Sequence, residues 1–350
     1  MIERRIMKKI SLALIISSVL AVQVFAVESG DLKQMLDDGN IGSIEAVLKE
    51  NPTNAEASFM AAIYYGKNNN ISKQLEYLQQ SADLGFTKAQ LQYGVSLLNQ
   101  GKVVEGLTYL EKSADQNYVP AMTLLGDLYF AGYFDQGGNE VLEQDFEKSE
   151  MYLKRAVSEG SQDARYTLAY LYLSPESGQQ NIDQSIALFE DNIDYVNQSG
   201  HLPSIMALID IYSKGEYVKA DQAKLTDYLY LASLQDYSPA FYSVGVMQRE
   251  GFKGDKIIIE KNPELAFDNI MKATKSGYLD AMFRLGEMYF KGEGTKQSDV
   301  DAYIWMAIAE EFSNVDTKYS ETILELIPKK ERQSAIDKKN HQYQLFSVKQ

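Results

Sequence analysis

Few side chains of this 350-residue chain are of the types that carry acid–base, metal or thiol chemistry. It has no cysteine and two histidines, His201 and His341, which lie far apart in the sequence. Zinc sites and most general bases depend on these residue types, and without cysteine there is no disulfide or thiol nucleophile. The sequence also has no Gly-x-Ser-x-Gly, phosphate-loop, His-Glu-x-x-His or Ser-x-x-Lys motif. We therefore expect no enzyme activity, no catalytic residue, no metal and no cofactor.

Charge then restricts the partners. Asp and Glu number 49 against 34 Lys and Arg, which gives a net charge of −15. Such a chain repels nucleic-acid phosphates and anionic lipid surfaces, so basic or neutral proteins are the expected partners. With so many carboxylates, a chance pair in a groove is no evidence for a glycosidase.

The first 26 residues have the pattern of a secretory signal peptide. A basic stretch is followed by an apolar run from Ile10 to Leu20, and then by small residues suited to cleavage after Ala26. The alternative, a membrane anchor, is disfavoured because the run is shorter than the roughly 20 residues that span a bilayer. We expect export to a bacterial periplasm, with secretion as the second choice and no membrane insertion after cleavage.

A repeated phrase organises the rest of the chain. An Ala or Ser is followed by an apolar residue two places later, an apolar and a small residue at places five and six, and usually Tyr at place nine. This spacing puts the apolar positions on one side of a helix, here called helix A, and a second amphipathic stretch, helix B, follows in each unit. The phrase opens at Ala57, Ala89, Ala121, Ala164, Ser204, Ala240 and Ala281.

Four residues before each of the last six openings stands a residue that tolerates positive φ. This placement predicts a helix end in the left-handed conformation at each of these positions. His201 follows one of them and is expected to fill an aromatic capping column, while His341 is expected to be solvated in a charged tail. The six positions are Gly85, Asn117, Gly160, Gly200, Asp236 and Gly277.

These residues resemble the Sel-one-like repeats, close relatives of tetratricopeptide repeats. Gly292-Glu293-Gly294 is similar to the family's loop between helices, and the stretch 302–307 to its helix B. The resemblance implies an all-α fold, a right-handed α–α superhelix (solenoid) of about seven helical hairpins. We expect a signal peptide at 1–26, an N-terminal helical cap at 27–56, the solenoid at 57–312, and a C-terminal helical cap and tail at 313–350.

If helix A lines a concave side, as the resemblance implies, places four and seven of the phrase point into a groove. The N-terminal third of this stripe is apolar, and the alternative is that the cap at 31–50 covers it. Further along, carboxylates could form an acidic wall that suits a partner with a hydrophobic anchor and basic residues. The favoured alternative is that these carboxylates are ordinary solvated side chains. The candidate partner-binding residues are Met60, Ile63, Gln92, Val95, Leu124, Asp127, Tyr170, Asp210, Arg284 and Glu287.

These features predict a periplasmic interaction module that holds a protein or peptide in its groove. The resemblance implies one possible role of this kind, that of an immunity protein that neutralises a secreted antibacterial toxin. An envelope adaptor or a host-factor binder is the alternative within the same class. An enzyme acting on the cell wall or on β-lactams is the rival class.

Overall fold

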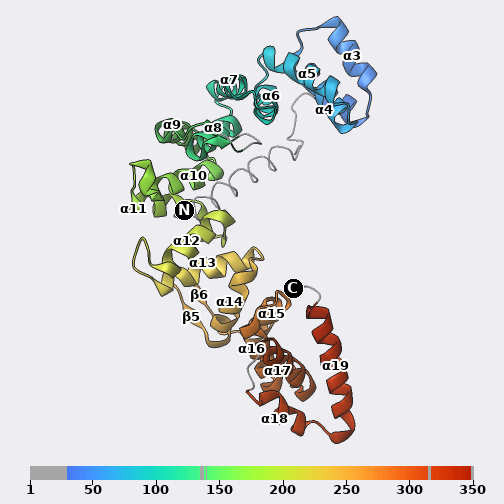
Figure 1. Cartoon of the computed structure of the whole chain (residues 1–350), viewed down its shortest axis with the longest axis vertical. Coiled ribbons are helices and arrows are strands. Elements are labelled where there is room, and N and C mark those ends of the chain that lie inside the picture. The colour runs from blue at the N-terminus through green and yellow to red at the C-terminus, as the bar shows by residue number, and fades with distance from the viewer. Residues whose placement is uncertain (1–29, 135–137, 139, 314–316, 348–350) are drawn as a thin grey trace. The chain divides into compact units, whose positions relative to one another are not determined.

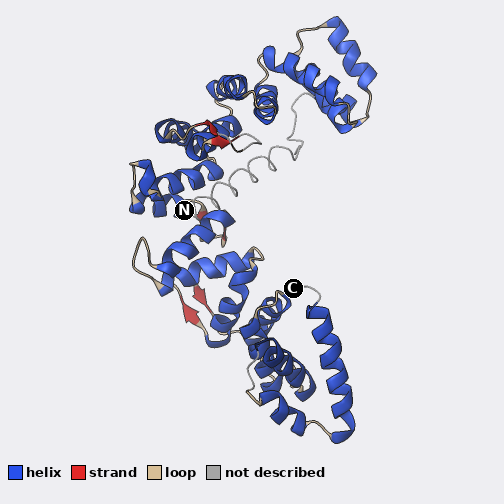
Figure 2. Ribbon diagram, in the orientation of Figure 1, coloured by secondary structure: helices blue, strands red, loops and turns tan. Residues whose placement is uncertain are grey.

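The computed structural model describes residues 30–134, 138, 140–313 and 317–347 of the chain. The predicted signal peptide at 1–26 lies outside these residues. Within them the fold is all-α, an α-solenoid of helical hairpins with a few short strands (Figures 1 and 2). The chain divides into two compact units, and the division falls between Leu188 and Phe189.

Unit 1 begins with two short helices and continues as helical hairpins. The short pair is α2 (Gly30–Asp37) and α3 (Ile41–Glu50). Each hairpin then has a helix A and a helix B. The hairpins are α4 (Ala55–Lys67) with α5 (Ile71–Asp83), α6 (Thr87–Asn99) with α7 (Val103–Asp115), α8 (Val119–Ala131) with α9 (Phe146–Ser158), and α10 (Gln162–Leu173) with α11 (Ile182–Glu190), which crosses into unit 2.

Unit 2 continues the hairpins and ends in two further helices. It contains α12 (Leu202–Lys214) with α13 (Gln222–Leu234), α14 (Ser238–Glu250) with α15 (Pro263–Lys275), and α16 (Leu279–Lys291) with α17 (Asp299–Ser313). The last two helices, α18 (Tyr319–Leu326) and α19 (Lys329–Ser347), are separated near Pro328, and α19 packs its Phe346 against Trp305 of α17.

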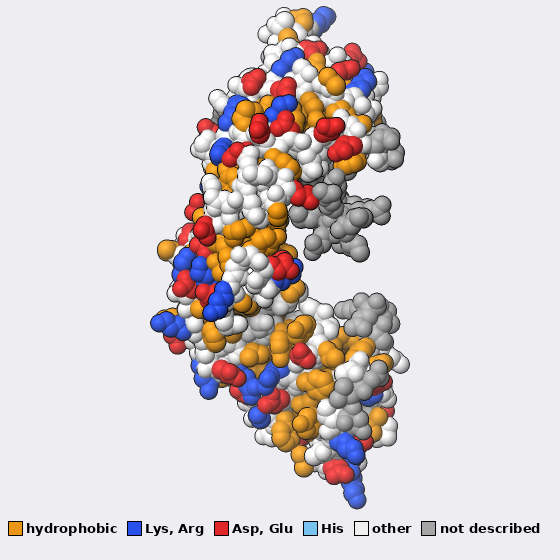
Figure 3. All heavy atoms as spheres, turned by 60° about the vertical axis from the view of Figure 1, so that its left-hand side comes forward, with side chains coloured by type: hydrophobic (Ala, Val, Ile, Leu, Met, Phe, Trp, Pro, Cys, Tyr) orange, Lys and Arg blue, Asp and Glu red, His pale blue; other side chains and the backbone are white. Residues whose placement is uncertain are grey.

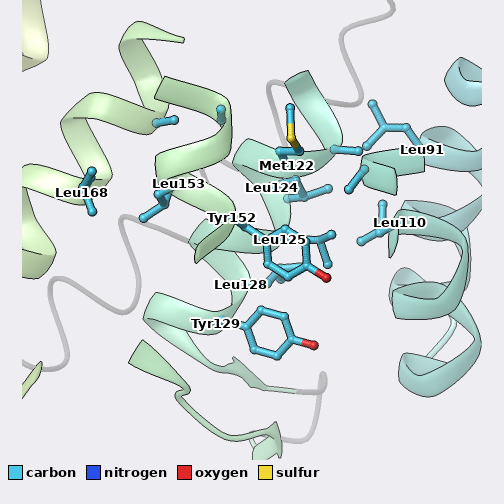
Figure 4. Packing of buried hydrophobic residues seen from close by; sticks show 14 of the residues in the cluster. Leu91, Leu110, Met122, Leu124, Leu125, Leu128, Tyr129, Tyr152, Leu153 and Leu168 are labelled. Atoms are coloured by element: carbon cyan, nitrogen blue, oxygen red, sulfur yellow. The ribbon is translucent and has the colours of Figure 1, made fainter. Parts of the chain in front are cut away.

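The repeated phrase accounts for the hairpins. Each of its seven opening residues is the third residue of a helix A and is buried, because this place faces the neighbouring helices. The small sixth residue lets helix B approach: a Cβ on Gly126 would lie 2.5 Å from the Leu153 side chain, and one on Gly94 would lie 2.9 Å from the Gly106 carbonyl oxygen. Leucines and stacked tyrosines from α8 and α9 fill the space between the helices (Figure 4).

Five of the six predicted helix ends are confirmed, and the sixth is wrong. Gly85, Asn117, Gly160, Asp236 and Gly277 all have positive φ, between 58° and 90°. Gly200 does not end a helix, because α11 already stops at Glu190. Gly200 instead belongs to a short antiparallel pair, β3 (Ile193–Asp194) with β4 (Ser199–Gly200).

Two more strand pairs lie in the longer loops between the helices of a hairpin. They are β1 (Tyr133–Phe134) with β2 (Glu140–Leu142) in unit 1, and β5 (Phe252–Lys253) with β6 (Ile258–Ile259) in unit 2. Much of the variation in repeat length therefore falls in loops between the two helices of a hairpin, as in other solenoids, and two of these loops fold into small strand pairs.

Candidate partner-binding face

In unit 1 the outward places of the A helices form a partly buried surface. Ile63 of α4, Gln92 and Val95 of α6, and Asp127 of α8 all keep part of their surface exposed. Thr167 and Tyr170 of α10 do the same. We call these six residues the unit 1 face. Two other predicted residues, Met60 and Leu124, are 0% and 6% exposed and belong to hydrophobic cores, so neither offers a partner surface.

The N-terminal part of this stripe is covered by the first helices of the chain. Met60 packs into one cluster with Leu36 of α2 and Ile44 of α3, and Ile63 lies against the same cluster. The cap at 31–50 therefore covers Met60 completely and Ile63 in part. Val95 packs instead against the core of the following repeats and stays partly exposed.

Asp127 is the chemically unusual residue of the unit 1 face. Its Oδ1 atom is shut off from solvent and has no hydrogen-bond partner among the described residues. Burial raises the pKa of Asp127 to about 7, a hydrogen bond from Thr167 opposes the shift, and the nearby Asp163 carboxylate adds to it. A buried acceptor without a donor costs about 1–3 kcal/mol. The pKa of Asp127 therefore lies near neutral pH, so this carboxyl is not a fixed negative charge on the face.

The α10 side of the face is built from one helical stripe. Asp163, Thr167 and Tyr170 follow one another at spacings of four and three, which puts them on the same side of the helix. Tyr166 and Tyr170 pack edge to face with their ring centroids 4.9 Å apart. Each ring restricts the other, so the aromatic part of this surface is held in place.

In unit 2 the predicted carboxylates are matched by basic residues. Asp210 is exposed and pairs with Lys214 one turn later, at 2.8 Å. Glu287 accepts from Arg284 at 2.5 Å and from Lys291 at 2.6 Å, and Arg249 of α14 lies at 3.4 Å. These cations hold the pKa of Glu287 below its ordinary value even though burial opposes the shift.

The acidic wall predicted from the sequence is therefore corrected. Burial raises the pKa of Asp127 to about 7, and Asp210 and Glu287 are paired with basic side chains. On the molecular face shown in Figure 3, acidic and basic side chains are interspersed rather than gathered by sign. Arg284 acts as a partner of Glu287 and not as a separate positive site.

A second set of polar residues was not predicted. In three repeats, a lysine of helix B lies over the tyrosine at place nine of helix A. This lysine stands three residues after the Asn or Asp at the N-cap of helix B. That tyrosine also packs beside another tyrosine four residues after the lysine. The same order of residue types recurs in the sequence and is the signal that could have identified it. The sets are Lys73 with Tyr65 and Tyr77, Lys148 with Tyr129 and Tyr152, and Lys224 with Tyr212 and Tyr228.

These aromatic sets join neighbouring repeats. The Tyr65 hydroxyl donates to Glu45 of the preceding helix at 2.6 Å, and the Tyr228 hydroxyl donates to Glu190 at the same distance. Tyr172 makes the equivalent bond to Glu150. Because each contact links consecutive hairpins through paired groups, we assign the sets to packing rather than to chemistry.

The two histidines are the remaining candidates for chemistry, and neither belongs to a group of metal-binding side chains among the described residues. His201 caps the start of α12, where its Nδ1 lies 2.9 Å from the Ser204 hydroxyl, and His341 is exposed. Among the residues that the structure describes, no group of three or more His, Cys, Asp or Glu side chains is arranged to hold a metal ion. In the same part of the chain no helix is long and apolar enough to cross a membrane.

Comparisons with known proteins identify the repeats. The Sel1 repeat model matches residues 55–86, 87–118, 119–161, 162–190 and 279–311, and every match begins where an A helix begins. The matched residues leave out α12–α13 and α14–α15, which carry Ile209 in the small sixth place and the β5–β6 insertion.

A relative and a solved structure carry the same repeat name, and a second relative is named for alginate biosynthesis. The chain is 24% identical over 204 residues to the Sel1-repeat-containing protein YjcO of Escherichia coli, covering 58% of this chain and 84% of that protein. It is 28% identical over 167 residues to the alginate biosynthesis protein AlgK of Pseudomonas syringae, covering 47% of this chain and 32% of AlgK. A crystal structure of a Sel1 repeat protein from Oxalobacter formigenes is 20% identical, with a TM-score of 0.41, and the match covers 89% of this chain and 99% of that one. The chain therefore contains Sel1 repeats over the matched residues, and this repeat fold generally mediates contacts between proteins.

Proposed function

We propose that this chain is an exported protein of the bacterial envelope that binds a protein or peptide partner through the unit 1 face and catalyses no reaction. The observation that carries the proposal is the Asp127 carboxyl, whose Oδ1 has no donor although it is buried on a face of helical outward positions. A group of this kind costs stability, and a partner that brings a donor removes that cost.

The rest of the unit 1 face supports a preformed binding surface. Tyr166 and Tyr170 restrain each other, so little side-chain entropy is lost when a partner packs against them. Val95 and Ile63 keep part of their apolar surface exposed. A polypeptide with one apolar anchor and one N–H or basic donor matches these groups.

The periplasm is the proposed location, and the support for it is the signal-like pattern of residues 1–26. The proposed biological role is immunity against a secreted toxin, with an envelope adaptor as the alternative. AlgK, to which part of the chain is similar, is named for alginate biosynthesis, and that similarity supports an envelope role of some kind.

Affinity capture from the periplasmic fraction tests the proposal. The wild type is compared with Asp127→Lys, which changes the unit 1 face, and with Glu105→Lys, which makes the same charge change on the exposed side of α7. Asp210→Lys tests whether unit 2 contributes to partner binding. Asp127→Asn keeps the size of the side chain and tests whether a loss of binding in Asp127→Lys comes from misfolding.

We expect Asp127→Lys to lose its partner while Glu105→Lys keeps it, with unchanged helical circular dichroism in both. Equal recovery of every partner by the wild type and Asp127→Lys would remove the unit 1 face from consideration. A turnover of envelope substrates that disappears with a single carboxylate would overturn the non-enzymatic part of the proposal.

A further inference from the structure

The β5–β6 hairpin in unit 2 folds back onto an earlier repeat. It is inserted between α14 and α15, yet its turn lies against α13 of the preceding hairpin: the Asp255 N–H donates to the Ala223 carbonyl oxygen at 3.3 Å. Ile257 and Ile259 are 6% and 3% exposed, so this side of the hairpin is part of the core. Its opposite side, with Ile258 and Lys253, is exposed.

Asp227 of α13 holds the turn of this hairpin. Its Oδ2 accepts from the Lys256 N–H at 2.6 Å and its Oδ1 from the Ile257 N–H at 3.1 Å. The Asp227 side chain is 1% exposed, so both backbone donors find their acceptor away from water. Two hydrogen bonds from successive amides to one carboxylate fix the turn in position and in orientation.

The turn also has a steric requirement. A Cβ on Gly254 would lie 1.8 Å from the Asp227 Oδ1 atom and 3.0 Å from the Ile257 carbonyl oxygen. Gly254 has no positive φ, so backbone strain does not explain why glycine is needed here. The close approach to Asp227 explains it, and any larger residue would push the turn away from α13.

A second attachment leads to the end of α11. The Lys256 Nζ lies 4.1 Å from the centre of the Tyr195 ring in the β3–β4 turn and 3.9 Å from the Glu190 Oε2 atom. Glu190 also accepts from the Tyr228 hydroxyl of α13 and pairs with Lys224 at 3.7 Å. One inserted turn therefore touches residues from two earlier repeats.

We propose that the β5–β6 hairpin is a strap that ties α13, the α14–α15 hairpin and the β3–β4 turn of unit 2 into one rigid block, with Asp227 as its anchor. The strap fixes α13 against α14–α15 through Asp227 and against the β3–β4 turn through Lys256. By holding these elements it also sets the spacing between the A helices α12 and α14, the surface that carries Asp210. This inference does not depend on the proposed partner or on the unit 1 face.

Hydrogen exchange measured by mass spectrometry on the full chain tests the strap. Asp227→Ala removes both acceptors, and Asp255→Asn is the matched control because the Asp255 side chain is exposed and its hydrogen bond to α13 comes from its backbone N–H. We expect the amides of residues 254–257 to exchange about 10- to 100-fold faster in Asp227→Ala, and residues 193–200 to be released as well. Asp255→Asn should exchange like the wild type.

Two further variants keep the test decisive if Asp227→Ala folds poorly. Gly254→Ala leaves Asp227 in place and should open the same segment by steric contact. Lys256→Met should release residues 193–200 alone and leave the Lys256 and Ile257 positions protected. Exchange of residues 254–257 within twofold of the wild type in both Asp227→Ala and Gly254→Ala, or equal effects of Asp255→Asn and Asp227→Ala, would overturn the strap.

Discussion

Replacing Asp127 with asparagine should make the protein more stable at alkaline pH and leave it unchanged in acid. Asp127 is a carboxyl group with a buried, unpaired Oδ1 and a single hydrogen bond from Thr167. Asparagine has nearly the same shape and can keep that hydrogen bond, but it never ionises. The substitution therefore removes the charge without removing volume.

The size of the effect follows from the pKa of Asp127, which burial raises from 3.8 to about 7. Between these values the folded state holds the proton more tightly than the unfolded state, so the free energy of unfolding falls as pH rises. The protonated carboxyl's contribution is fully present below about pH 4 and is lost as pH passes 7. At 1.36 kcal/mol for each pKa unit, ionisation costs the folded wild type about 4 kcal/mol in alkaline solution.

Thermal and guanidinium unfolding followed by circular dichroism at pH 5 and pH 8 measure this difference. We expect Asp127→Asn to be more stable than the wild type by about 1.5 kcal/mol at pH 5, which is already above the unfolded pKa of 3.8, and by about 4 kcal/mol at pH 8. Asp210→Asn is the control, because Asp210 is an exposed carboxylate whose pair with Lys214 contributes about 0.5 kcal/mol or less. A midpoint difference that is the same at both pH values would refute the reasoning.

Three further substitutions have defined outcomes. Gly126→Ala puts a Cβ 2.5 Å from the Leu153 side chain and should lower the free energy of unfolding in guanidinium by about 1–3 kcal/mol. Tyr228→Phe removes the hydroxyl that donates to Glu190 and should cost about 1.5 kcal/mol in the same assay, and an unchanged midpoint would show that this bond does not stabilise unit 2. Asn117→Ala should lower the free energy of unfolding by about 1 kcal/mol while Asn117→Gly does not, because Asn117 follows α7 in the left-handed conformation at φ 58°; equal losses would argue against a conformational cause.

The helical hairpins could be predicted because their determinants are local. The opening residue, the small sixth residue and the helix-ending glycine all lie within about a dozen residues of one another and act through the geometry of one helix pair. Gly126 shows this, since its contact with α9 follows from the phrase itself. The error at Gly200 has the opposite origin: α11 stops ten residues earlier at Glu190, and the β3–β4 pair occupies the interval.

The candidate site was harder to predict because charge depends on neighbours that are distant in sequence. Glu287 counts as an acidic position, but Arg249 reaches it from another helix 38 positions away. Asp127 also counts as acidic, and only its burial against α10 shows that it titrates near neutral pH. The Asp227 anchor has no signature in its own helix, because its donors are backbone amides about 30 residues later.

Site-specific photo-cross-linking tests most directly whether the unit 1 face contacts the partner. A photoreactive amino acid is placed at Gln92 on that face, and for comparison at Val104 on helix α7, which is 80% exposed. We expect a discrete cross-linked species from Gln92 in the cells that produce the chain, and none from Val104. Cross-links from Val104 with none from Gln92 would contradict the proposed binding face.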